Sequence, residues 1–171
     1  VRLLGLLIII LACLMLLPAL LSFLTGQPAE AQVFFYCSLV SLSIGLAMFA
    51  LASLAKFNLS GRQVFLLTSL SWLVLSFFAA LPFMFASAQL NFTDAMFESI
   101  SGLTTTGASL LVNLEAQSTA ILLWRALLQW LGGIGIIVLG MAILPFLQVG
   151  GMRLFQSESS DWSAKAVPRS A

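Results

Sequence analysis

The sequence contains no histidine, and only 8% of its 171 residues are charged. Without histidine, histidine-ligated metal sites and histidine general bases are excluded. The seven basic and six acidic residues are too few to cover a water-soluble domain, in which roughly a quarter of the residues are charged. A net charge of +1 also lacks the clustered basic residues of a nucleic-acid-binding protein, so we expect no nucleic-acid partner.

Apolar residues make up 61% of the sequence. A helix that crosses a bilayer needs about 20 mostly apolar residues. Four stretches of the sequence qualify: Leu3–Leu24, Val33–Ala55, Val64–Ala86 and Thr119–Leu147. We therefore expect an all-α integral membrane protein whose main surroundings are lipid.

The positions of the basic residues predict an orientation. Six of the seven lie before the first apolar stretch, between the second and third, or after the last: Arg2, Lys56, Arg62, Arg153, Lys165 and Arg169. Arg125, near the start of the last stretch, is the exception. Because Lys and Arg are enriched in cytoplasmic segments, we expect both termini of this chain to be cytoplasmic. Glu30 and Glu115 should then face outward.

The connection between the third and fourth apolar stretches contains a short helical pattern. Thr93 is the predicted N-cap, Asp94 suits the positive end of the helix dipole, and Gly102 is expected to end the helix. A helix of this length spans about half of a bilayer core. We therefore expect a re-entrant loop, which enters the membrane and returns on the same side while lining a cavity.

The segment Leu-Thr-Thr-Thr-Gly-Ala at 103–108 follows this short helix. Threonine favours extended backbone, and glycine permits positive φ, so several carbonyls could face one way. The negative end of the short helix would point at the same place. These features predict a cation filter formed by backbone carbonyls, with an ordinary threonine-rich loop as the alternative. The candidate ligands are Thr104, Thr105, Thr106 and Gly107.

Segments 97–109 (Phe-Glu-Ser-Ile-Ser-Gly-Leu-Thr-Thr-Thr-Gly-Ala-Ser) and 124–136 (Trp-Arg-Ala-Leu-Leu-Gln-Trp-Leu-Gly-Gly-Ile-Gly-Ile) resemble the membrane subunit of Trk-type potassium uptake systems. This is the TrkH/TrkG class of the Trk/Ktr/HKT superfamily, and the resemblance covers essentially the whole chain. It implies a pseudo-fourfold, cation channel-like fold of four helix–pore loop–helix repeats, each supplying one quarter of a selectivity filter. Two leading transmembrane helices (1–60), the first repeat (61–148) and a cytoplasmic polar segment (149–171) follow this order. The chain is thus expected to be an N-terminal fragment that lacks three repeats.

The same resemblance implies potassium uptake across the bacterial inner membrane by a multi-pass monovalent cation transporter. Potassium is then the transported substrate, with no cofactor and no catalytic residues. A homodimer and a cytosolic nucleotide-binding regulatory subunit are implied as partners. No nucleophile–base constellation accompanies the carboxylates, so an enzyme is not expected. The alternative is a non-conducting membrane scaffold or assembly subunit whose short helix lies at the membrane interface.

Two further features have more than one interpretation. Glu98 lies on the same face of the short helix as Asp94, but deeper, so it needs a partner or water. We interpret it as attracting cations to the outer mouth, with an ion pair to Arg125 as the alternative. The glycines at 132, 133, 135 and 140 predict close packing or a bend in the last helix, because small residues let helices approach closely in lipid.

Overall fold

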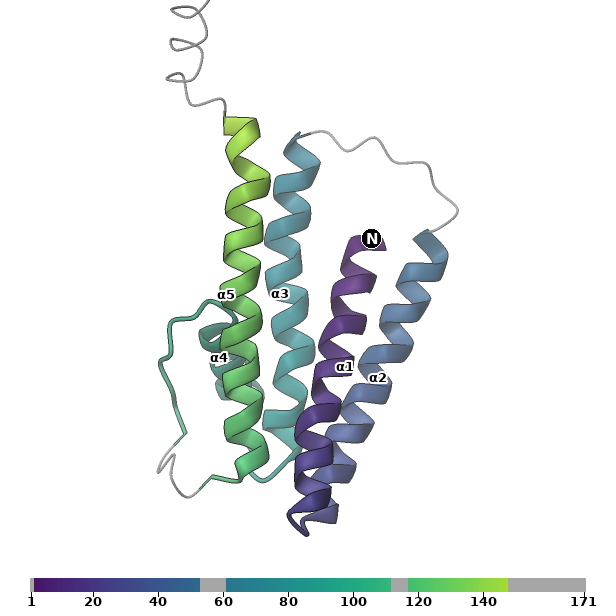
Figure 1. Cartoon of the computed structure of the whole chain (residues 1–171), viewed down its shortest axis with the longest axis vertical. Helices are drawn as coiled ribbons and strands as arrows, with labels where there is room; N and C mark the ends of the chain where they lie inside the picture. Colours follow the sequence, from purple (N-terminus) through teal and green to yellow (C-terminus); the bar gives the residue numbers. More distant parts are fainter. Residues whose placement is uncertain (1, 53–60, 112–116, 148–171) are drawn as a thin grey trace, which may run out of the picture. The chain divides into compact units, whose positions relative to one another are not determined.

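The computed structural model describes residues 2–52, 61–111 and 117–147, which form five α-helices (Figure 1). They are α1 (Arg2–Leu24), α2 (Pro28–Ala52), α3 (Gly61–Phe85), α4 (Phe92–Leu103) and α5 (Thr119–Leu147). All except α4 are long and apolar enough to cross a membrane, and the described residues contain no β-strand. The prediction of an all-α chain with four apolar spans is confirmed.

The start of α2 differs from the prediction. It begins at Pro28 rather than Val33, and Glu30 lies in its first turn. Proline suits the first helical position because its fixed φ is already helical and its missing N–H would have had no partner there. An acidic side chain in the first turn is stabilised by the helix dipole. Several predicted features lie outside the described residues: Ala55, Lys56, Glu115, and the segment 149–171 with its basic residues.

α1 and α2 form an antiparallel hairpin (Figure 1). Gly26 in the turn has a φ of +76°, and the next residue, Gln27, donates its N–H to the Ser22 carbonyl at 2.9 Å. This left-handed glycine ends α1. Further along the hairpin, Gly5 and Gly45 bring the two backbones into contact, since a Cβ atom on Gly5 would lie 2.8 Å from the Gly45 carbonyl oxygen.

Trp124 of α5 joins the hairpin to α3. The side chain is fully buried, its Nε1 donates to the Ala79 carbonyl of α3 at 3.0 Å, and its ring meets Phe34 of α2 edge-on at 6.3 Å between centroids. A buried indole needs a partner for its N–H, so this contact fixes both the ring and the helices around it. Residues Val1–Ile136 form one compact unit, and the rest of α5 belongs to a second unit.

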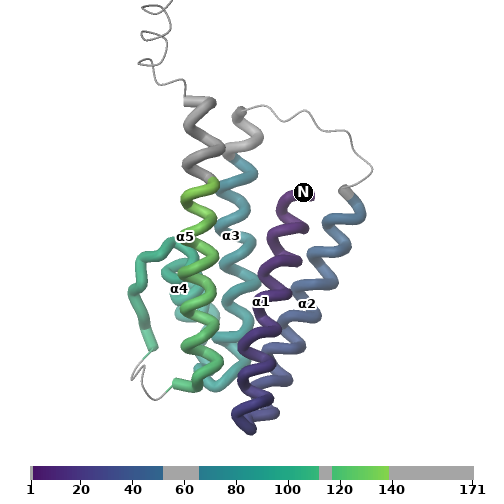
Figure 2. Tube along the Cα trace, in the orientation of Figure 1, coloured from purple at the N-terminus to yellow at the C-terminus, as the bar shows by residue number. Residues whose placement is uncertain are grey.

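α4 is followed by a segment that runs back toward the start of α5 (Figure 2). We call residues 104–111 the return segment. Its path along α4 is fixed at Ser101, whose carbonyl accepts from the N–H groups of Thr106 at 3.0 Å and Gly107 at 3.4 Å. The Ser101 hydroxyl in turn donates to the Ala108 carbonyl at 2.6 Å. α4 and the return segment are therefore held together as one loop between α3 and α5.

Candidate cation-binding segment

α4 begins at a side-chain cap on Asn91. Its side-chain oxygen accepts from the Asp94 N–H at 2.9 Å, and its amide nitrogen donates to the Asp94 carboxylate at 2.8 Å. The prediction of Thr93 as the N-cap is wrong, because the helix starts at Phe92 and Thr93 already lies inside it. Asparagine is among the strongest N-cap residues, and it precedes the threonine in the chain. Asp94 occupies the first turn as expected.

α4 ends in a Schellman motif built by the threonines. The Thr105 N–H donates to the Gly102 carbonyl, and the Thr106 N–H donates to the Ser101 carbonyl, each at 3.0 Å. Thr105 has a φ of +59°, the left-handed conformation that glycine usually supplies at this position. A β-branched residue there is a genuine outlier that costs about 1–2 kcal/mol. Backbone strain is thus held inside the predicted filter.

The predicted extended run is wrong at its start. Leu103 is still helical, and Thr104 (φ −80°, ψ 0°) caps the helix, so the helix ends one residue after Gly102. The Thr104 hydroxyl donates to the Ile100 carbonyl at 2.8 Å and is shared with the Thr106 hydroxyl at 2.8 Å. The helix therefore engages the first threonine, and irregular backbone begins only after Thr105.

Gly107 has a φ of +76°, as the sequence predicts. A Cβ atom at this position would lie 3.6 Å from the side-chain nitrogen of Gln129 on α5. The four predicted ligand residues, Thr104–Gly107, are all exposed. In the part of the chain that the structure describes, no N–H or O–H group donates to any of their four backbone carbonyls. These oxygens are available to water or to an ion.

Glu98 anchors the far end of the return segment. Its side chain has no exposed surface, and its Oε2 lies 3.0 Å from Arg125 Nε. This contact lacks the alignment of a hydrogen bond, so it is an ion pair. The other oxygen, Oε1, accepts from the Ser109 hydroxyl at 2.7 Å and from the N–H groups of Leu110 at 2.5 Å and Leu111 at 3.3 Å. The pairing of Glu98 with Arg125, stated above as the alternative, is present.

The glycines of α5 have distinct roles that the sequence did not separate. A Cβ atom on Gly132 would lie 1.9 Å from the carbonyl oxygen of Leu103, the last residue of α4. On Gly133 it would meet Thr105 only at 4.0 Å, and on Gly135 it would meet the Trp72 ring at 3.6 Å. Gly132 therefore forms the notch that receives the C-terminal end of α4. Because several glycines lie close together in α5, the sequence does not indicate which of them contacts α4.

Side-chain metal chemistry has no candidate cluster among the described residues, since no group of three or more Cys, Asp or Glu side chains converges there. Cys13 and Cys37 are both free, with Cys13 exposed and Cys37 buried.

Comparison with known proteins agrees with the resemblance based on segments 97–109 and 124–136. Residues 30–166 match the family model TrkH, described as a cation transport protein. The Trk system potassium uptake protein TrkI of Halomonas elongata is 45% identical over 168 residues, covering 98% of this chain and 34% of that protein. TrkH of Salmonella typhimurium is 46% identical over 158 residues, covering 92% of this chain and 32% of that protein.

A solved structure is similar as well. The crystal structure of the potassium transporter TrkH from Vibrio parahaemolyticus aligns with a TM-score of 0.80 and 40% sequence identity, covering 95% of this chain and 35% of that chain. The chain thus spans about a third of the length of the curated relatives that it matches.

Proposed function

The chain belongs to the TrkH family of cation transport proteins, and from this premise we propose that it forms the first part of a potassium uptake protein. Residues 1–60 are its two leading transmembrane helices, and residues 61–148 are its first helix–pore loop–helix repeat. Residues 149–171 lead to the repeats that complete the pore. The relatives named above are potassium uptake proteins, so no enzymatic activity is proposed.

The observation that carries this proposal is the run of four exposed residues, Thr104–Gly107, whose carbonyls accept from no hydrogen-bond donor among the described residues. A potassium ion that leaves water needs its hydration shell replaced by closely placed oxygens, and a run of backbone carbonyls supplies them. The C-terminal end of α4, which carries the negative end of its dipole, lies next to this run. We assign these residues as one quarter of the selectivity filter.

The proposal makes α4 a pore helix and its loop re-entrant. α4 has 12 residues, which at about 1.5 Å per residue span about half of a bilayer core of about 30 Å. Its start follows α3, and the return segment leads back toward α5 at the same end of the bundle (Figure 2). Irregular backbone at membrane depth is tolerated only beside protein or water, and a filter satisfies both conditions.

The non-conducting scaffold is the second candidate. A short helix that lies at the interface turns its polar side chains to water and its apolar side chains to lipid. α4 differs from this pattern because three of its polar side chains, Glu98, Ser99 and Ser101, are buried within the protein. Its polar groups hold the return segment, which an interfacial helix does not require. This arrangement favours the pore loop.

The contacts of Glu98 support a role in positioning the return segment. Its carboxylate holds the return segment through Ser109 and Leu110, and Arg125 balances its charge. Attraction of cations to the outer mouth by Glu98 stays a prediction.

The proposed setting is the bacterial inner membrane, with both termini of this chain in the cytoplasm. The partition of the basic residues supports this orientation. A homodimer and a cytosolic nucleotide-binding regulatory subunit are proposed as partners, and the family resemblance supports both.

Rubidium flux tests the proposal. Membrane vesicles would contain a full-length protein that carries this chain as its N-terminal third, and isotope uptake would be compared with vesicles that lack the protein. We expect saturable rubidium uptake that excess potassium suppresses and excess sodium suppresses weakly. Uptake equal to that of protein-free vesicles would support the scaffold.

A further inference from the structure

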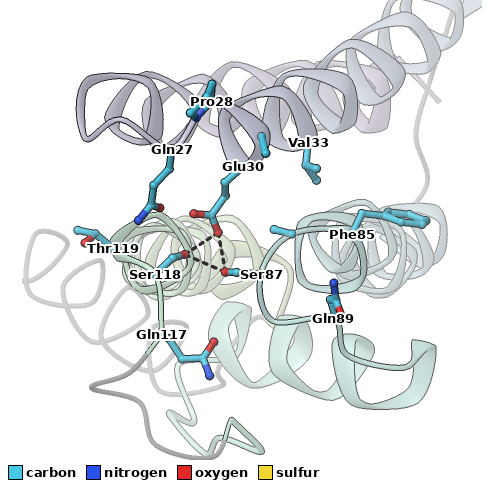
Figure 3. A pocket seen from close by; sticks show the side chains of 12 residues that line it. Gln27, Pro28, Glu30, Val33, Phe85, Ser87, Gln89, Gln117, Ser118 and Thr119 are labelled. Carbon is cyan, nitrogen blue, oxygen red and sulfur yellow. Dashed lines mark hydrogen bonds between the residues drawn. The ribbon is translucent and has the colours of Figure 1, made fainter.

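Glu30, in the first turn of α2, contacts two serines from distant parts of the chain (Figure 3). Its Oε1 accepts from the Ser87 hydroxyl at 2.7 Å and from the Ser118 hydroxyl at 2.6 Å. The two hydroxyl oxygens lie 3.1 Å from each other. The residue is only 8% exposed. These three side chains, which we call the serine clamp, line a pocket of about 680 Å³ at this end of the molecule.

The two serines occupy the two ends of the pore loop. Ser87 follows the last residue of α3, Phe85, and precedes α4, while Ser118 immediately precedes α5. The Ser118 hydroxyl also accepts from the Ile121 N–H at 3.3 Å, so it caps α5. Everything between the serines, including α4 and the return segment, forms a loop whose ends meet at one carboxylate.

Physical chemistry makes this contact strong and directional. A buried carboxylate is costly unless hydrogen bonds satisfy it, and hydrogen bonds to a charged oxygen are about twice as strong as neutral ones. The N-terminal end of α2 also stabilises the negative charge of Glu30. The charge therefore holds both serines in place.

The clamp complements the anchors already described. Gly132 and Glu98 fix the C-terminal end of α4 and the return segment against α5. Neither of them contacts Ser87, where the loop leaves α3. α3 holds the start of the loop through its packing against α4 and through the Leu90 N–H, which donates to the Phe83 carbonyl at 3.0 Å. The clamp adds a direct link between this start and the N-terminal end of α5, and small misplacement of a positioned group is costly.

We propose that Glu30 is a positioning residue for ion selection: the leading hairpin uses it to lock both ends of the pore loop, and through them the carbonyls at Thr104–Gly107. This inference rests on the proposed function, since it assigns a role relative to that filter. It gives the leading hairpin of α1 and α2 a task in ion selectivity.

The test compares Glu30→Ala with Glu30→Gln in the full-length protein at matched membrane abundance. Alanine removes the acceptor, whereas the amide oxygen of glutamine still accepts from both serines. We expect Glu30→Ala to lower the rubidium-to-sodium uptake ratio about tenfold, the scale of one lost charge-assisted hydrogen bond. Glu30→Gln keeps both acceptor contacts but loses the charge, so its uptake ratio should lie between those of Glu30→Ala and the wild type. Gln32→Ala, at an exposed position on the same helix, is the matched control and should leave the ratio unchanged.

A covalent rescue separates positioning from folding. The Ser87 and Ser118 hydroxyls are in contact, so Ser87→Cys with Ser118→Cys should form a disulfide in a Glu30→Ala protein without other cysteines. Oxidation should raise the uptake ratio and reduction should lower it again, on the same folded molecules. A cross-link that forms without changing the ratio overturns the proposal.

Two further variants are decisive. If Glu30→Ala does not reach the membrane, Ser87→Ala with Ser118→Ala replaces it, and an unchanged ratio in that variant overturns the proposal. Gly107→Ser, measured in parallel, separates this inference from the filter itself. If Gly107→Ser changes the ratio and Glu30→Ala does not, the clamp proposal fails and the filter stands. If neither changes it, the filter assignment fails.

Discussion

Gly132 of α5 lies directly against the carbonyl of Leu103, and a Cβ atom at this position would be 1.9 Å from that oxygen. Leu103 is the last residue of α4, so its carbonyl precedes the proposed filter by one residue. The close approach sets the depth at which α4 docks on α5. Because a backbone atom is involved, no side-chain rotation can relieve a clash there.

We predict that Gly132→Ala disrupts the docking of α4. In a helix interior, alanine is normally favoured over glycine by about 1 kcal/mol, but here the added methyl group must displace the backbone of Leu103, and overpacking costs about 1–3 kcal/mol or more. The unfolding temperature in detergent should fall, together with rubidium uptake. Gly133→Ala is the matched control, since its Cβ atom would have 4.0 Å to the nearest atom. Equal stability of the two variants would contradict the close packing of α4 against Gly132.

The ion pair between Glu98 and Arg125 leads to a second prediction. Glu98→Ala leaves the Arg125 guanidinium without its counter-charge and removes the acceptor for the return segment. Breaking one partner of a buried pair costs about 3–5 kcal/mol. Asp94→Ala on the same helix should cost less than about 1 kcal/mol, because Asp94 is partly exposed and acts mainly on the helix dipole. Thermal unfolding in detergent measures both, and similar shifts would argue against the anchoring role of Glu98.

Features set by composition were predictable from the sequence. The four spans follow from the number of consecutive apolar residues, and the positive φ of Gly107 follows from a glycine placed after three threonines. Thr105 was not predicted to have φ of +59°, because a β-branched residue disfavours that conformation. It adopts it because it occupies the position that ends α4, where the Schellman hydrogen bonds require a left-handed residue.

The contacts of Glu30 with the two serines could not be predicted. Glu30 and Ser118 are 88 residues apart in sequence, and nothing in the local pattern of either residue indicates the other. The Asn91 cap was missed for a different reason: Asn91 and Thr93 are both good N-caps, and the choice between them depends on where the chain leaves α3. For Glu98 the sequence indicated the need for a partner and offered Arg125 as one alternative, and the structure contains this ion pair.

The strain at Thr105 leads to a third prediction. Thr105→Gly should stabilise the protein by about 1 kcal/mol, because glycine adopts positive φ without the Cβ penalty. Thr106→Gly is the control, since the positive-φ residues of this segment are Thr105 and Gly107. Glycine at 106 gains nothing there and adds backbone entropy to the unfolded state, so it should destabilise. The unfolding midpoints of the two variants should therefore move in opposite directions. A decrease for both would show that Thr105 is not strained.

Orientation can be tested by labelling. Single cysteines at Gln27 and Glu115, in a full-length protein without other cysteines, should react with an impermeant thiol reagent added outside intact cells. A cysteine at Ser60 should be protected until the membrane is opened. Because basic residues are retained on the cytoplasmic side, this pattern is expected. Labelling of Ser60→Cys in sealed cells would contradict this orientation.

The last prediction concerns Gly107. Its φ of +76° disfavours any side chain by about 1 kcal/mol or more, and a Cβ atom there would lie near the Gln129 side chain. Gly107→Ser should therefore shift the filter carbonyls and let sodium compete better with rubidium, at unchanged membrane abundance. Thr105→Val keeps the shape of the side chain and removes only its hydroxyl, so it should have a milder effect if the carbonyls are the ligands. Uptake of rubidium and sodium by the full-length variants measures both. If Gly107→Ser keeps the wild-type ratio and rate, the segment is a connection between helices and the carbonyls do not select the ion.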